Sequence, residues 1–94
     1  MPLFRDFEEC KKIAVLILLD FLEEGHPLVK ELLDRIKYEE SSERKSKGKC
    51  YMVTTKLKKA LWHNEEAISM GFDAYLRRIV ESKRFEIDYK EANP

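Results

Sequence analysis

An apolar stripe near the start of the chain places the strongest constraint on the fold. Between residues 6 and 24 the large apolar side chains recur at helical spacing, and Ile13–Leu19 is apolar throughout. A helix that is apolar almost all round must be covered on most sides, either as the central helix of a fold or in a dimer interface. We therefore expect a homodimer whose interface includes four residues of this stripe: Ile13, Leu16, Ile17 and Phe21.

The same run of residues is too short to cross a membrane. Ile13–Leu19 has seven residues, whereas a spanning helix needs about 20. Acidic side chains precede the run, which is unlike the basic start of a signal peptide. The chain has two cysteines, Cys10 and Cys50, too few for a disulfide scaffold, and the sequence leaves open whether they are free or bridged, since a bridge requires an oxidising or thermophilic setting. We expect a cytoplasmic protein that does not contact membranes.

Turn residues indicate how the rest of the chain is organised within one domain, residues 1–94. Gly25 ends the first helix and Pro27 begins a second, which predicts a helical hairpin over residues 5–38. Residues 39–49 contain no apolar side chain, and we expect a basic solvated loop there. Residues 50–90 then predict a strand, a helix, a turn, a helix and a strand.

The pattern within residues 50–90 gives the bounds of these elements. We expect strands over Cys50–Thr54, which is rich in β-forming residues, and over Phe85–Tyr89, where apolar and polar residues alternate. We expect helices over Lys56–Met70 and Ala74–Lys83, separated by Gly71. The expected fold is therefore mainly α with a minor two-stranded β ribbon, an α+β class.

The charge of the chain is zero in total but is distributed unevenly. Lysine and arginine number 18, as do aspartate and glutamate, which argues against a protein that coats nucleic acid by bulk charge. Residues 41–60, however, contain 7 basic residues and 1 acidic residue. This basic segment predicts phosphate contacts, made by the following residues: Arg44, Lys45, Lys47, Lys49, Lys56 and Lys58.

The stretch Glu65–Glu81 carries a resemblance to a known class of proteins. It reads as helix, glycine turn and helix, with the small residue Ala67 four positions before Gly71. With a strand expected on each side, it resembles the winged-helix and helix-turn-helix class of small DNA-binding regulators. The resemblance implies a homodimeric transcriptional regulator whose recognition helix, Asp73–Arg84, contacts DNA through four residues: Arg77, Arg78, Lys83 and Arg84.

Two other interpretations fit the same residues. A strand followed by two helices is also the order of ribbon-helix-helix repressors, although Cys50–Thr54 is less polar than base readout normally requires. Alternatively, the chain is a protein-interaction module, an adaptor or inhibitor that binds no nucleic acid and docks a partner through its apolar first helix. The zero net charge favours this second alternative.

Neither catalysis nor a metal or other cofactor is indicated. The four metal-binding candidates are Cys10, His26, Cys50 and His63, and no two of them lie within four residues, whereas structural zinc ligands usually occur in close pairs. The sequence has no glycine-rich phosphate loop and no recognisable Ser/His/Asp grouping. We expect no enzymatic activity.

Overall fold

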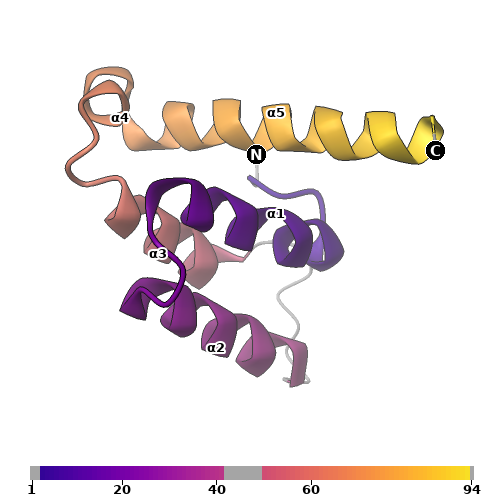
Figure 1. Cartoon of the computed structure of the whole chain (residues 1–94), viewed down its shortest axis with the longest axis horizontal. Coiled ribbons are helices and arrows are strands. Elements are labelled where there is room, and N and C mark those ends of the chain that lie inside the picture. Colours follow the sequence, from indigo (N-terminus) through magenta and orange to yellow (C-terminus); the bar gives the residue numbers. More distant parts are fainter. Residues whose placement is uncertain (1–2, 42–49, 94) are drawn as a thin grey trace.

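The computed structural model describes residues 3–41 and 50–93, which form five α-helices and no strand (Figure 1). In chain order the helices are α1 (Phe7–Phe21), α2 (Pro27–Ser41), α3 (Tyr51–Ala60), α4 (Glu65–Met70) and α5 (Phe72–Ala92). Helix α1 packs against α2, α3 and α5, while α4 packs against α5. The long α5 lies along one edge of the molecule, with α1 between it and α2 (Figure 1).

Local signals explain where α1 begins and ends. Asp6 is the N-cap, and its carboxylate accepts a hydrogen bond from the backbone N–H of Glu9 at 2.8 Å, which satisfies one of the free amides of the first turn. Helix α1 ends at Phe21 with Leu22 as its C-cap, earlier than the end at Gly25 that the sequence predicted. Gly25 lies in the turn to α2 with φ 90°, a left-handed conformation that glycine tolerates best. Pro27 is the first residue of α2, where its fixed φ and missing N–H cause no loss.

The expected strand over Cys50–Thr54 is wrong, because α3 begins at Tyr51 with Cys50 as its N-cap. The buried side chains of this segment are three and four residues apart, which is the spacing of a helix: Cys50, Val53, Leu57 and Leu61. The β-forming residues suggested a strand, but burial against α1 outweighs a weak local preference.

The expected helix over Lys56–Met70 is in fact two helices. Helix α3 ends at Ala60, and the turn at 61–64 leads into α4. The side chain of Asn64 caps α4, because it accepts a hydrogen bond from the backbone N–H of Ala67 at 2.9 Å. The turn at Gly71 lies where the sequence placed it, with φ 91°.

The second expected strand, Phe85–Tyr89, lies inside α5, which continues to Ala92. Among the described residues no strand remains, so the α+β class is wrong and the structure is an all-helical fold. A winged helix requires a β wing, and a ribbon-helix-helix protein requires a paired strand. Both interpretations are therefore wrong for residues 3–41 and 50–93.

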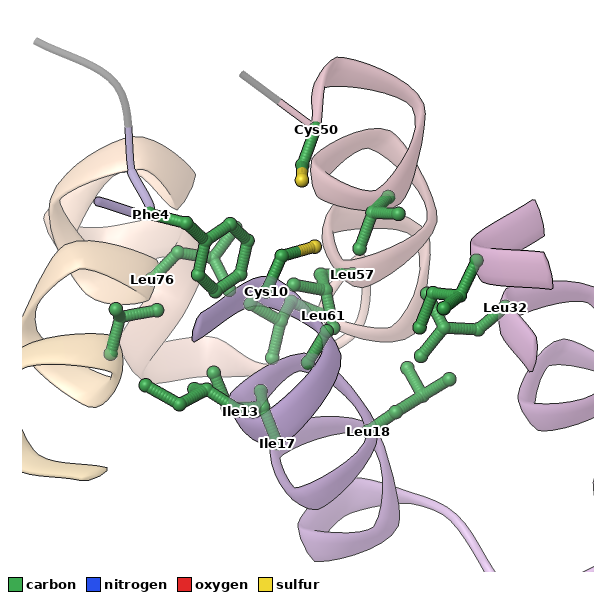
Figure 2. Packing of buried hydrophobic residues seen from close by; sticks show 14 of the residues in the cluster. Phe4, Cys10, Ile13, Ile17, Leu18, Leu32, Cys50, Leu57, Leu61 and Leu76 are labelled. Atoms are coloured by element: carbon green, nitrogen blue, oxygen red, sulfur yellow. The ribbon is translucent and has the colours of Figure 1, made fainter. Parts of the chain in front are cut away.

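The apolar stripe of α1 forms the centre of the core (Figure 2). Ile13 and Ile17 are each 1% exposed, and Leu18 is 0% exposed. Their neighbours are buried side chains of the other helices, including Leu32 of α2, Leu57 of α3, and Leu76 and Val80 of α5. Helices of the same chain therefore cover most of the stripe.

Candidate interaction surface

The structure places five of the residues predicted to contact DNA, from both the resemblance and the basic segment, next to carboxylates of the same chain. Lys83 lies 3.1 Å from Asp20, and Lys58 lies 2.6 Å from Asp73. Arg78 donates to Glu66 at 2.7 Å and lies over the ring of Tyr75. The remaining described pairs are Lys56 with Glu31 and Arg84 with Glu9.

The residues predicted to contact DNA have different environments. Arg77 is half-buried, and Arg84 points into the protein, where Glu9 and the carbonyl of Leu3 accept its hydrogen bonds. The other predicted residues, Arg44, Lys45, Lys47 and Lys49, lie outside the described residues. DNA contact by these residues stays a prediction.

The four residues expected at a dimer interface have different environments. Ile13 and Ile17 are buried in the core of the chain itself. Phe21 is half-buried, and its ring centroid lies 6.3 Å from that of Tyr75. Leu16 is 45% exposed, so it is the most accessible of the four to another molecule. The homodimer stays a prediction.

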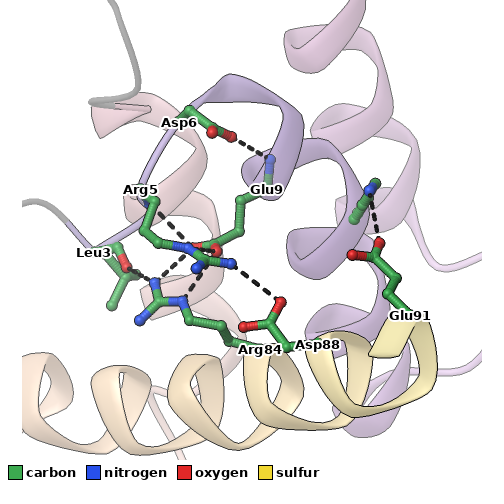
Figure 3. A network of polar contacts seen from close by, with 8 residues as sticks. Leu3, Arg5, Asp6, Glu9, Arg84, Asp88 and Glu91 are labelled. Carbon is green, nitrogen blue, oxygen red and sulfur yellow. Dashed lines mark hydrogen bonds and ion pairs between the residues drawn. The ribbon is translucent and has the colours of Figure 1, made fainter. Parts of the chain in front are cut away.

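Glu9 lies at the centre of a polar network that joins the N-terminal segment to α5 (Figure 3). Its carboxylate accepts hydrogen bonds from the side chain of Arg84, at 2.9 Å for Nε, and from the side chain and backbone N–H of Arg5. Arg5 also pairs with Asp88 at 3.4 Å. Residue Glu9 is only 7% exposed, so two guanidinium groups compensate a buried charge.

This environment holds the pKa of Glu9 at about 2, below its ordinary value of 4.5. Burial alone would raise the pKa, because it disfavours the charged form, but the hydrogen bonds from Arg84 and Arg5 outweigh it. The carboxylate is therefore bound more strongly in the folded state than a free glutamate would be. The sequence around Glu9 does not indicate this ion pair, because Arg84 lies far away in the chain, on the last helix, α5.

Acid is expected to destabilise the fold through Glu9. Because its pKa is lowered on folding, its contribution is present above the ordinary value near pH 4.5 and is lost as the pH falls toward 2. The shift corresponds to about 3 kcal/mol of unfolding free energy. Urea unfolding at a series of pH values between about 5 and 2 measures this loss.

The matched variants are Glu9→Gln and Glu91→Gln. Glu9→Gln should be less stable at neutral pH and should lose little further stability in acid. Glu91 is exposed and lies 3.6 Å from Lys12, so Glu91→Gln should keep the acid loss of the wild type. Equal acid dependence of wild type and Glu9→Gln would contradict the assignment.

Beside this network lies a hollow of about 130 Å³ between the start of α1 and the second half of α5. Its lining contains charges of both signs, among them Asp6, Lys12 and Asp88. Its two arginines both bind Glu9. The hollow therefore favours neither an anion nor a cation, and we assign no ligand to it.

The chain matches no known family. No protein-family model, curated protein or solved structure matched it. Within residues 3–41 and 50–93, no helix has the length and apolar character needed to span a membrane. In the same part of the chain, no three His, Cys, Asp or Glu side chains are grouped as metal ligands would be. The function must therefore be inferred from the surface of the molecule.

The most distinctive surface feature is a pair of stacked aromatic side chains on α5. Phe85 is 72% exposed and Tyr89 is 60% exposed. Their ring centroids are 6.4 Å apart and their planes differ by 22°. The two rings lie on the side of α5 opposite to Leu76 and Val80, which are buried. The sequence did not indicate this exposed pair, because the predicted strand over Phe85–Tyr89 implied that both rings were half-buried.

Acidic residues surround the two rings. On a helix the neighbours of a side chain lie three and four positions away. For Phe85 and Tyr89 these neighbours include three carboxylates and no basic residue: Glu81, Glu86 and Asp88. All three are exposed, and Asp88 is also paired with Arg5 at 3.4 Å. We call Phe85, Tyr89 and these three carboxylates the acidic aromatic face of α5.

Proposed function

We propose that the protein is a protein-interaction module that docks a basic amphipathic helix of a partner protein on the acidic aromatic face of α5. The observation that carries this proposal is the exposed pair Phe85 and Tyr89, ringed by carboxylates. Aromatic side chains supply large contact area and are frequent at the centres of interfaces. The proposal assigns no catalytic role to the chain.

The charge of this face selects the partner. Exposed carboxylates around an apolar centre attract lysine and arginine and repel phosphate. A nucleic acid is therefore a poor occupant. An amphipathic helix with apolar residues along one face and basic residues beside them matches both the rings and their acidic rim.

A second copy of the chain is also a poor occupant of this face. In a two-fold dimer the same patch of each subunit meets the other. Glu81 and Glu86 would then approach their own copies, and like charges at an interface oppose association.

A synthetic peptide tests the proposal. We expect a fluorescein-labelled amphipathic helix with leucine on one face and lysine beside it to bind the wild type, as measured by fluorescence anisotropy. Phe85→Ala should weaken binding about tenfold or more, as loss of an interface hot spot does. The matched control is Tyr38→Ala, because Tyr38 is 62% exposed on α2 but lies outside the proposed face; this variant should bind as the wild type does.

Charge reversal gives the second half of the test. The same peptide with glutamate in place of lysine should not bind, and added salt should weaken binding of the lysine peptide. Equal binding of both peptides, or no effect of Phe85→Ala, would contradict the proposal. Sedimentation equilibrium of the protein alone shows whether a dimer forms, and a dimer that Phe85→Ala dissociates would identify a second copy as the occupant.

A further inference from the structure

The two cysteines of the chain are brought together in the core, although they are far apart in the sequence. Cys10 lies in the first turns of α1, and Cys50 is the N-cap of α3. Both are 0% exposed, and both are free thiols. The sulfur of Cys50 points toward Cys10, and both sulfurs lie in the gap between the two helices (Figure 2); the two side chains are within hydrogen-bonding reach of one another.

The backbone fixes both thiols in this position. The carbonyl of Cys50 accepts hydrogen bonds from the backbone N–H and the hydroxyl of Thr54, at 2.9 and 3.1 Å. The backbone N–H of Cys10 donates to the carbonyl of Asp6 at 3.1 Å. Cys50 itself has φ 45°, which is uncommon for a residue other than glycine. The start of α3 is therefore held so that the Cys50 side chain faces α1.

The surroundings of the pair favour chemistry between the two sulfurs. Other side chains near the pair include Phe4, Leu57 and Leu61, which are apolar and buried (Figure 2). Within the described residues, no third ligand joins the two thiols in a group that could hold a metal. A facing pair of thiols without a metal is the arrangement from which a disulfide forms.

We propose that Cys10 and Cys50 are a dithiol–disulfide site, which oxidation converts into a covalent link between α1 and the start of α3. The oxidant is a small disulfide such as oxidised glutathione. A thiolate of the protein attacks one sulfur of the oxidant and releases one thiol. The second cysteine then attacks the protein sulfur of this mixed disulfide and releases the other thiol. In total, two thiol protons and two electrons pass to the oxidant, which becomes two thiols.

Cys50 is the better first nucleophile. A hydrogen bond from the Cys10 thiol lowers the pKa of Cys50, against the effects of burial and of the carboxylates of Glu39 and Asp6, which raise it. The hydrogen bond with Cys50, together with burial, raises the pKa of Cys10. The position of Cys50 at a helix N-terminus favours a thiolate in the same sense. Because both sulfurs are buried, the fold must open locally before the oxidant can enter, so oxidation should be slower than that of an exposed thiol.

The test uses the whole folded chain in mixtures of reduced and oxidised glutathione, quenched with acid and then alkylated in denaturant, which exposes both thiols. We expect both thiols to become resistant to alkylation together, with a loss of about 2 Da and no retained glutathione. A digest without reductant should contain one peptide pair joined through Cys10 and Cys50. The thermal midpoint should rise by roughly 10 °C or more, because the bridge closes a long loop, and dithiothreitol should reverse the rise.

Single variants provide the control. Cys10→Ala and Cys50→Ala should each keep one thiol and should show neither the mass loss nor the reversible thermal shift. Three results for the wild type would each overturn the proposal. These are a persistent glutathione adduct, a bridge between two chains, and thiols that remain open to alkylation in the most oxidising mixture. The wild-type measurements decide the question even if a variant fails to fold.

Discussion

Replacing Ile17 by glutamate should unfold the protein, whereas the same change at the preceding residue should have little effect. Ile17 is 1% exposed and Leu16 is 45% exposed. A glutamate at position 17 would place an unpaired charge in the core, which we expect to cost at least about 4 kcal/mol of unfolding free energy. That is comparable with the whole stability of a small domain. Leu16→Glu should cost less than about 1 kcal/mol.

Circular dichroism during urea unfolding measures both variants. The pair also separates two explanations of the apolar stripe in α1. If the stripe were a dimer interface, Leu16→Glu would dissociate the wild-type dimer and Ile17→Glu would leave a folded monomer. In the structure, other helices of the same chain cover the stripe. In that case only Ile17→Glu should abolish the helical signal in circular dichroism. Equal effects at the two positions would contradict the packing described for α1.

The variant Arg84→Met should remove about 3 kcal/mol of stability. Arg84 is the main partner of Glu9, and its loss leaves a buried carboxylate with only the exposed Arg5 beside it. Breaking one side of a buried ion pair is strongly destabilising, because the remaining charge is no longer compensated. The double variant Glu9→Leu/Arg84→Met should recover most of the loss, since no buried charge remains.

Arg78→Met is the matched control, because it changes another arginine of the same helix. Arg78 and Glu66 form an ion pair in which both side chains are 56% exposed. Such surface pairs contribute at most about 1 kcal/mol. A loss for Arg84→Met no larger than the loss for Arg78→Met would contradict the role given to Glu9 at the contact of α1 and α5.

The helices that the sequence predicted correctly are those with a long apolar stripe or a clear turn. The stripe in α1 continues over several turns, and Pro27 begins α2 as predicted, although α1 ends at Phe21, four residues before Gly25. Only a helix places so many apolar side chains on one side over that length. Gly71 is likewise a reliable boundary, because its left-handed backbone ends α4.

The two strand predictions failed because each segment has only five residues, Cys50–Thr54 and Phe85–Tyr89. So short a segment does not distinguish the period of a helix, about 3.6 residues, from the period of a strand, about 2 residues. Residues two positions apart on a helix differ by about 200° in direction. Phe85, Ile87 and Tyr89 therefore alternate between opposite sides of α5 almost as they would in a strand. Ile87 packs against the core, and the two rings face outward. Only the continuous stripe from Leu76 through Val80 to Ile87 distinguishes helix from strand.

The candidate sites could not be predicted for a different reason. The pairing of Glu9 with Arg84, and of Cys10 with Cys50, joins residues from opposite parts of the chain, and no local pattern encodes such contacts. Asp6 followed by Glu9 is typical of a helix start, but it does not indicate that the Glu9 side chain reaches an arginine on α5. The acidic aromatic face became visible only when Phe85–Tyr89 proved to be helical.

The most direct test of the proposed function is a titration of ¹⁵N-labelled protein with the lysine-rich amphipathic peptide, followed by amide chemical shifts in NMR spectra. We expect the largest shifts on the second half of α5, around Phe85 and Tyr89, with small changes on α2. Phe85→Ala should reduce those shifts at the same peptide concentration. Shifts centred instead on α1 around Leu16, or no shifts at peptide concentrations that saturate binding, would contradict docking on the acidic aromatic face.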